Sequence, residues 1–398
     1  MKEKFLRELA DIQTGPFGSQ LHKEDYVADG TPIVTVEHLG NKMFSEQNLP
    51  RVSNTDKNRL KKYVLKQGDI VFSRVGSVDR CSYVDQKHDG WMFSGRCLRV
   101  RPTSEIDSEY LYYYFCLEET KQFVRNISVG ATMPSINTKL LGEVVVTFPE
   151  LEQQKRISGI LSAIDSKIEV NQKINDNLEQ QAAALFKSWF VDFSLFGGTV
   201  PENWEDTTLE NITTLITRGI APKYSDNSDQ TVVNQKCIRN HTIDLSLART
   251  HTPKAINEKW LKFGDLLINS TGDGTLGRVA QVWFAPKALT VDSHVTIVRP
   301  AREELIFYIG LWGILHEKEI ESLHTGSTGQ TELPRDRVKM LKLLLPDNIS
   351  LSRFNSIIAP MASTIILNQE ENQKLASLRD TLLPKLMSGE IDVSSIQL

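Results

Sequence analysis

The chain carries one ordered set of short motifs twice, about two hundred residues apart. In the first half Gly68-Asp69 opens GDIVFSRVGSVDR and Gly130 opens GATMPSIN. In the second half Gly264-Asp265 opens GDLLINSTGDGTLGR and Gly326 opens GSTGQTEL, with the same separation between the two glycines. Recurrence at a fixed spacing is typical of a structural unit used twice. A chain of 398 residues is long enough for two such units, each with its own core.

Each half reads as short strands interrupted by one helical stretch. The first half has PIVTV, DIVFS, CLRVR and EVVVTF, separated by Gly, Asn, Asp and Pro, and the second has DLLINS, RVAQVWF, HVTIVRP and MLKLLLP. Such β-branched and aromatic runs between turn residues are typical of strands. The single helical stretches are SEYLYYYFCLEETKQFVRN and EELIFYIGLWGILHEKEIESL. We therefore predict an α+β domain that is made twice.

Beyond each domain lies a long segment in which apolar residues step at heptad spacing, from 151 to about 190 and from about 351 to 387. The first segment predicts a helix roughly 60 Å long at 1.5 Å per residue. A shift of 197 residues aligns the two segments, so that Ile168 meets Ile365 and asparagines meet asparagines. The candidates for helix pairing and partner binding are Ile157, Ile164, Ile168, Asn171, Asn175, Leu178, Leu185, Ile365, Asn368, Asn372, Leu375 and Leu382.

Asparagine pairs within an apolar seam lower stability but fix the register of paired helices. An antiparallel pairing would put the two globular domains at opposite ends of a coiled coil, related by a pseudo-twofold axis; a parallel pairing would put both at one end. Pro360 predicts a break or kink in the second helix, whose continuous part would then begin near Met361.

Bulk properties indicate an ordinary globular protein. The chain is 40% apolar and 24% charged, and it has no apolar run long enough to cross a bilayer. Its N-terminus lacks the pattern of a secretion signal, so we expect a cytoplasmic protein that does not associate with membranes. The four cysteines show neither disulfide nor zinc spacing, and we expect no bound metal. A net charge of −4 argues mildly against nucleic acid, whose binding partners are usually basic.

No catalytic motif is recognisable. The sequence has a literal GxGxxG at 272–277, but RVAQVWFAP follows it, which is an alternating strand pattern rather than the helix that a dinucleotide site requires. A tight turn between two strands explains these glycines better. P-loop and HExxH motifs are absent. We therefore expect a non-catalytic chain with no cofactor of its own.

Polar side chains are concentrated on and near the two Gly-Asp hairpins. Hydroxyl groups suit phosphate oxygens, and Arg and Asn can make bidentate contacts to guanine and adenine edges. Side chains that only stabilise the turn are the alternative. Basic clusters at 51–66 and 249–262 stand just ahead of the two hairpins. The DNA-binding candidates are Arg74, Ser77, Arg80, Arg96, Arg99, Asn269, Ser270, Thr275 and Arg278.

Several longer segments resemble the specificity subunit of type I restriction-modification enzymes. They are FPELEQQKRISGILSAIDSKIEVNQKINDNLEQQAAALFKSWFVDF, VPENWEDTTLENI, the two Gly-Asp hairpins and ENQKLASLRDTLLPKLMSGEI. The resemblance implies target recognition domains at 1–150 and 196–346, and spacer helices at 151–195 and 347–398, the last with a C-terminal tail. Each domain would read one half of a split, asymmetric site in double-stranded DNA.

The resemblance also implies partners. The helices would bind two methyltransferase (modification) subunits, which recruit two restriction (translocase-nuclease) subunits, and S-adenosylmethionine, ATP and magnesium would belong to those partners. Two other functions stay open from the residues alone: a two-headed coiled-coil scaffold that does not bind DNA, and an enzyme with an unrecognised site.

Overall fold

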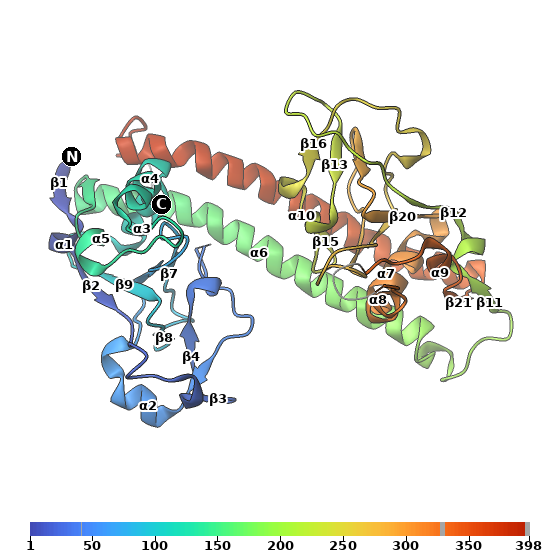
Figure 1. The fold of residues 1–398 in the computed structure, drawn as a ribbon, viewed down its shortest axis with the longest axis horizontal. Coiled ribbons are helices and arrows are strands. Elements are labelled where there is room, and N and C mark those ends of the chain that lie inside the picture. Colours follow the sequence, from blue (N-terminus) through green and yellow to red (C-terminus); the bar gives the residue numbers. More distant parts are fainter. Residues whose placement is uncertain (41, 327–330, 395–398) are drawn as a thin grey trace. The chain divides into compact units, whose positions relative to one another are not determined.

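The computed structural model describes residues 1–40, 42–326 and 331–394, which form two compact units. Unit 1 contains Met1–Val170 together with the chain from Glu371 onward, and unit 2 contains Asn171–Glu370. The division cuts both long helices, α6 (Leu151–Phe190) and α10 (Asn348–Ser388). Each unit therefore consists of one globular part and one half of each long helix (Figure 1).

Unit 1 is built on a four-stranded antiparallel sheet in the order β2-β9-β6-β7. A second sheet has the order β3-β5-β4-β8, and its β4 and β8 run parallel. The N-terminal strand β1 pairs with β10, the strand that leads into α6. The strands are β1 (Lys2–Phe5), β2 (Ala10–Thr14), β3 (Tyr26–Val27), β4 (Thr31–Val34), β5 (Arg51–Val52), β6 (Ile70–Ser73), β7 (Cys81–Tyr83), β8 (Met92–Phe93), β9 (Cys97–Pro102) and β10 (Val145–Phe148).

Unit 2 repeats the main features of this construction. Its main sheet has the order β12-β20-β17-β18, a second sheet β16-β13-β19 again contains a parallel pair, and β11 pairs with β21 ahead of α10. Strands β14 and β15 form an additional hairpin. The strands are β11 (Glu205–Thr208), β12 (Thr213–Arg218), β13 (Thr231–Val233), β14 (Ile238–Arg239), β15 (Thr242–Ile243), β16 (Arg249–Thr250), β17 (Leu266–Asn269), β18 (Val279–Gln281), β19 (Leu289–Val291), β20 (Val295–Pro300) and β21 (Lys342–Leu345).

Both main sheets are covered on both faces, which explains why their strands are continuous apolar runs rather than alternating ones. In β6, Ile70 and Phe72 face the core that contains the helices, whereas Val71 faces the core of the second sheet. In β17, Leu266 faces the core that contains the helices, and Leu267 faces the core of the second sheet.

The helical stretch predicted in each half is in fact divided. In unit 1 it forms α3 (Ser108–Cys116) and α4 (Glu118–Ile127), because Leu117 adopts an extended ψ of 134°. In unit 2 it forms α7 (Ile306–Leu315) and α8 (Glu317–Ser322), which follow a 3₁₀ turn. The first helix of each pair is mostly buried and the second is amphipathic, so the break lets the second helix lie along the surface. Short helices complete the units: α1 (Leu6–Leu9), α2 (Asn54–Arg59), α5 (Thr138–Leu141) and α9 (Arg335–Lys339).

The predicted break at Pro360 is wrong, because α10 runs without interruption from Asn348 to Ser388. Proline in a helix loses one backbone hydrogen bond, to the carbonyl four residues earlier. Here Pro360 and Ser356, whose carbonyl loses that bond, are both exposed, so water can replace the missing donor. The helix therefore continues through the proline.

Within each unit, the two long helices are antiparallel. In unit 1, Asp165 pairs with Arg379 and Lys167 pairs with Glu371. In unit 2, Asn368 Nδ2 donates to Asn175 Oδ1 over 2.8 Å, and farther along Phe186 contacts Phe354. The predicted α+β class with long paired helices is confirmed. In the described residues, none of the helices combines the length and apolarity needed to span a membrane.

Candidate nucleic-acid interface

The aspartate of each Gly-Asp pair is buried and holds an arginine from the neighbouring strand. Asp69 accepts two hydrogen bonds from Arg101, each of 2.7 Å, and it also accepts the backbone N–H of Lys66. Asp265 does the same with Arg299, at 2.8 and 2.7 Å, and with the N–H of Lys262. Hydrogen bonding to Asp69 raises the pKa of Arg101. The motif therefore ties the hairpin to the sheet in both units and is structural.

The turns that follow these strands contact the second glycine motif of the repeat. In unit 1, the N–H of Gly76 donates to the carbonyl of Pro134 over 2.8 Å, and Val75 forms a bridge with Ser135. In unit 2, Thr271 forms a bridge with Glu332, and the N–H of Leu333 donates to Ser270. Residues 327–330 of GSTGQTEL lie outside the described residues. Each unit thus brings its Gly-Asp hairpin and its second glycine motif together at the edge of the main sheet where β6 or β17 ends, which we call the hairpin edge.

Four of the DNA-binding candidates of unit 1 lie on or beside this pair of turns. Ser77 and Arg96 are exposed, and the carbonyl of Arg96 accepts the N–H of Arg74 over 2.8 Å. The Arg74 guanidinium donates to the carbonyl of Gly95 and lies 5.9 Å from the ring centre of Phe17. Arg80 donates to the carbonyl of Leu39, which anchors the other side of the hairpin.

Arg99, the fifth candidate in unit 1, lies away from this surface. Its side chain is 3% exposed and forms an ion pair with Asp11, and burial lowers its pKa from the ordinary value. A guanidinium in this position supports the sheet and is not presented to a ligand.

The candidates of unit 2 divide between the interior and the surface. Asn269 and Ser270 are 0% exposed. Asn269 Nδ2 donates to the carbonyl of Gln235, and the hydroxyl of Ser270 lies 2.6 Å from that of Thr296. Thr275 and Arg278 are partly exposed, and Arg278 donates to the carbonyl of Gly274 within the turn.

The GxGxxG segment is a turn between antiparallel strands, as the residues after it predict. It connects β17 to β18, and Gly272, Gly274 and Gly277 all have positive φ, at 105°, 66° and 83°. Only glycine adopts such angles readily, so the three glycines are explained by the path of the chain.

Exposed apolar side chains at the same edge of unit 1 were missed by the sequence reasoning. Phe17 is 56% exposed, and Met133, in the turn that Gly130 opens, is 68% exposed. Val129, which bridges Ser135, is 63% exposed. Hydrophobic patterning cannot identify them, because an isolated apolar residue in a loop looks the same whether it is buried or exposed. Together with Arg74 they form a mixed apolar and cationic surface.

In unit 2 an aromatic pair was also missed. Arg249 of the second basic cluster stacks on Tyr224, with its guanidinium carbon 3.7 Å from the ring centre. Both side chains are exposed, and this arrangement leaves the edge of the guanidinium open to a ligand.

The helix-pairing candidates line the seam between α6 and α10. Asn171 and Asn175 are buried, as are Ile157 and Ile365. The remaining candidates are partly buried: Ile164, Ile168, Leu178, Leu185, Asn368, Asn372, Leu375 and Leu382. A polar network that the heptad pattern did not reveal joins the same seam in unit 1, where Asp165 accepts from both Tyr113 and Arg379.

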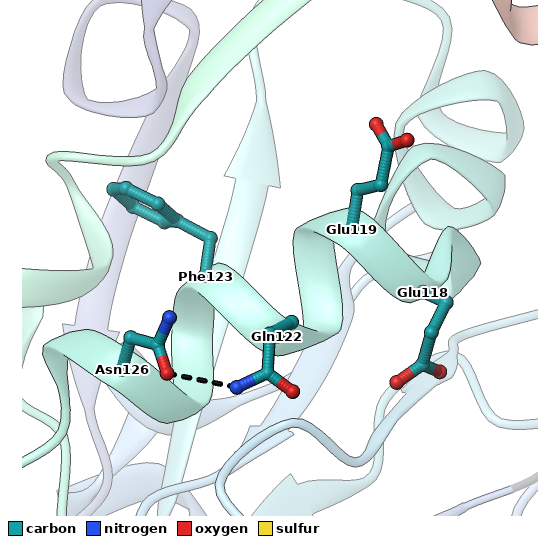
Figure 2. A pocket seen from close by; sticks show the side chains of 5 residues that line it. All are labelled: Glu118, Glu119, Gln122, Phe123 and Asn126. Atoms are coloured by element: carbon teal, nitrogen blue, oxygen red, sulfur yellow. Dashed lines mark hydrogen bonds between the residues drawn. The ribbon is translucent and has the colours of Figure 1, made fainter.

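The described residues offer little that resembles an active site. They include no group of three or more His, Cys, Asp or Glu side chains that could hold a metal ion. A depression of about 440 Å³ lies over α4, and all five lining residues come from that helix. Figure 2 shows that Glu118 and Glu119 point to different sides of the helix, so they do not converge as a catalytic pair would.

Comparison with known proteins gives one consistent result. Residues 1–180 match the family model described as the type I restriction modification DNA specificity domain. The specificity subunit of the type I restriction enzyme MjaIX of Methanocaldococcus jannaschii is 28% identical over 323 residues, which cover 75% of this chain and 72% of that protein. The HindI specificity subunit of Haemophilus influenzae is 23% identical over 411 residues, or 83% of this chain and 88% of that protein.

A solved structure shares the fold. The crystal structure of the S subunit of a type I restriction-modification system from M. genitalium gives a TM-score of 0.57 at 16% identity, and the match covers 97% of this chain and 95% of that one. The matching domain belongs to the class of DNA specificity domains. Residues 1–180 therefore match a DNA specificity domain, and the chain as a whole resembles the specificity subunits of type I restriction enzymes.

Proposed function

We propose that this chain reads a bipartite, asymmetric DNA target in which two short half-sites are separated by a fixed spacer. The globular part at 1–150 reads one half-site and the part at 196–346 reads the other. The observation that carries the proposal is the repeated contact between two turns. Gly76 meets Pro134 in unit 1 and Ser270 meets Leu333 in unit 2, at equivalent edges of equivalent sheets.

The residues at the two edges differ, which supports an asymmetric target. Unit 1 has Arg74, Ser77 and exposed Met133, whereas unit 2 has Thr271, Thr275 and Arg278. Because base edges are distinguished by the donors and acceptors that face them, two edges with different side chains should select different bases.

The long helices are the element that would fix the spacer and hold the partner subunits. Two modification (methyltransferase) subunits would bind the helices, and two restriction subunits would join through them. S-adenosylmethionine, ATP and magnesium would serve those partners, and the chain itself would supply recognition without catalysis in the cytoplasm.

Affinity would come from the assembled complex. With a net charge of −4, the chain gains little from releasing the counterions of DNA, which is the main source of affinity in basic proteins. We therefore expect the isolated chain to bind DNA weakly and to lose that binding as salt rises.

A mobility-shift assay with and without the modification subunit tests the proposal. We expect sequence-selective shifts only when both proteins are present. A scaffold that does not read DNA would add no sequence preference to the modification subunit. Nanomolar, sequence-specific binding by the chain alone at physiological salt would refute the dependence on the complex.

A further inference from the structure

The seams of the two long helices are so similar that each helix could pair with its own copy. When α6 is shifted by 197 residues onto α10, five seam positions carry the same residue type: Ile168 with Ile365, Asn171 with Asn368, Asn175 with Asn372, Leu178 with Leu375 and Leu185 with Leu382. These shared positions, asparagines included, offer the same side chains to a like partner as to an unlike one. The shared seam therefore does not explain why α6 selects α10.

A polar layer within the seam of unit 1 is one of the places where the two seams differ. In unit 1, Asp165 of α6 lies 2.8 Å from Arg379 of α10, with side chains that are 12% and 32% exposed. The hydroxyl of Tyr113 in α3 donates to the second carboxylate oxygen of Asp165 over 2.6 Å. Tyr113 in turn accepts from Lys42, so the globular part of unit 1 is joined to the ion pair.

The equivalent layer of unit 2 is apolar. The shift of 197 residues converts Asp165 to Ala362 and Arg379 to Ala182, and both alanines are 1% exposed in the core of unit 2. Tyr110 and Tyr308 occupy equivalent positions, because their hydroxyls donate to carbonyls of β10 and β21 respectively. Three residues farther along, Tyr113 of unit 1 therefore corresponds to buried Leu311 of unit 2. Among the residues that the structure describes, this layer therefore holds an ion pair in unit 1 and two alanines in unit 2, and the two charges of the pair lie on different helices.

A like pairing would separate these charges. In the same antiparallel register, α6 of a second copy would place Ala182 where α10 places Arg379, so each Asp165 would lose its guanidinium. A pair of α10 helices would likewise set Arg379 against Ala362. Because Asp165 is only 12% exposed, the loss of its guanidinium should destabilise the like pair, although less than for a fully buried charge.

We propose that Asp165 and Arg379 make α6 select α10 in preference to α6 of a second copy of this chain. The selection keeps one unit of each kind in every molecule. It holds whether or not the two units read DNA, and under the proposed function it keeps the two half-sites different.

The order of synthesis shows when the selection matters. Unit 1 and α6 leave the ribosome before α10 is made, and the intervening 200 or so residues take roughly 10–40 s at 5–20 residues per second. During that time α6 exposes its seam to other chains from the same message. An unpaired Asp165 in each α6 disfavours their association until α10 arrives.

The test uses two full-length copies with different affinity tags, expressed together. Three forms are compared: the native chain, Asp165→Ala/Arg379→Ala, which reproduces the alanine layer of unit 2, and Asp165→Arg/Arg379→Asp, which restores the pair with reversed charges. Purification on one tag followed by quantification of the other gives the fraction of mixed dimers, and light scattering gives their mass. Melting temperatures verify that each form is folded.

We expect at least a threefold rise in mixed dimers for the alanine form and a return to the native level for the reversed pair. Lys173→Cys identifies the dimer, because in a like pair residue 173 faces its own copy and a short bismaleimide then links the two chains. The proposal fails if the alanine form gives no more mixed dimer than the native chain, if the reversed pair gives as much as the alanine form, or if the added dimers are not linked through residue 173. Loss of DNA recognition with native levels of mixed dimer would bear on the proposed function alone.

Discussion

At the scale of single residues, two side chains of the same type can have different roles, and their burial decides which. Arg74 and Arg99 are both DNA-binding candidates from the sequence, yet Arg74 lies at the hairpin edge, whereas Arg99 is buried and paired with Asp11. The sequence identified polar residues on the hairpins. It could not show which face of a strand each side chain occupies, because both main sheets are covered on both faces and alternation is lost. Asn269 and Ser270 became candidates for the same reason.

Substitution at the Gly-Asp pairs should affect stability. Asp265→Asn would leave Arg299 without its carboxylate, and breaking a buried ion pair costs about 3–5 kcal/mol. Asp69→Asn should cost less, because Arg101 is 29% exposed against 11% for Arg299. Calorimetric melting of the full chain measures both variants, with exposed Asp273→Asn as the control. Equal melting temperatures for all three would contradict the structural role of the motif.

Substitution at the hairpin edge should affect DNA binding. Arg74→Ala and Arg96→Ala should each weaken binding of the assembled complex to its target by about 1–3 kcal/mol, or roughly 5- to 150-fold, and should lower the salt dependence where the contact is to phosphate. Arg99→Ala should instead lower the melting temperature. Fluorescence anisotropy over a salt series separates the two effects. Full affinity after loss of both Arg74 and Arg96 would exclude this edge as the DNA contact.

At the scale of elements, the helices were largely predictable and their interruptions were not. Heptad spacing predicted α6 over 151–190, and the structure gives Leu151–Phe190. By contrast, the break at Leu117 interrupts a segment with good helical pattern, and α10 continues through Pro360 where local rules predict a break. In both cases surroundings decide the outcome: the division lets α4 lie on the surface, and the exposed side of α10 lets water replace one hydrogen bond.

The start of α10 should be sensitive to acid. Asp347 accepts the N–H groups of Ile349 and Ser350, and it also accepts the indole N–H of Trp204 over 2.8 Å. Burial opposes ionisation, but these hydrogen bonds prevail and lower the pKa of Asp347 to about 2. Because this value lies below the ordinary 3.8, the carboxylate stabilises the fold fully above about pH 4, and the contribution is lost as pH falls toward 2.

Asp347→Ala should therefore destabilise unit 2 by about 1–2 kcal/mol at neutral pH, as expected for loss of an N-terminal cap. The difference from the native chain should shrink below pH 4. Urea unfolding followed by tryptophan fluorescence at several pH values measures it. A difference that stays constant down to pH 2 would show that the charge of Asp347 contributes nothing.

At the scale of the whole molecule, the chain contains one construction twice, and the two copies have diverged. The two units share strand order, Gly-Asp anchors and adjoining turns, but they differ at the exposed edge and in the layer that holds Asp165 and Arg379. The repeated glycines made the duplication visible in the sequence, because turns with positive φ depend on glycine. The ion pair was not visible there, since its two residues are separated by more than two hundred positions.

Methylome sequencing tests the central claim, that two different units read two different half-sites. A host that carries this chain with its modification subunits should acquire methylation at one motif composed of two unlike half-sites with the same gap in every copy. A host that lacks the chain should show none of it. A single uninterrupted motif, two identical half-sites, or no new methylation would contradict the account.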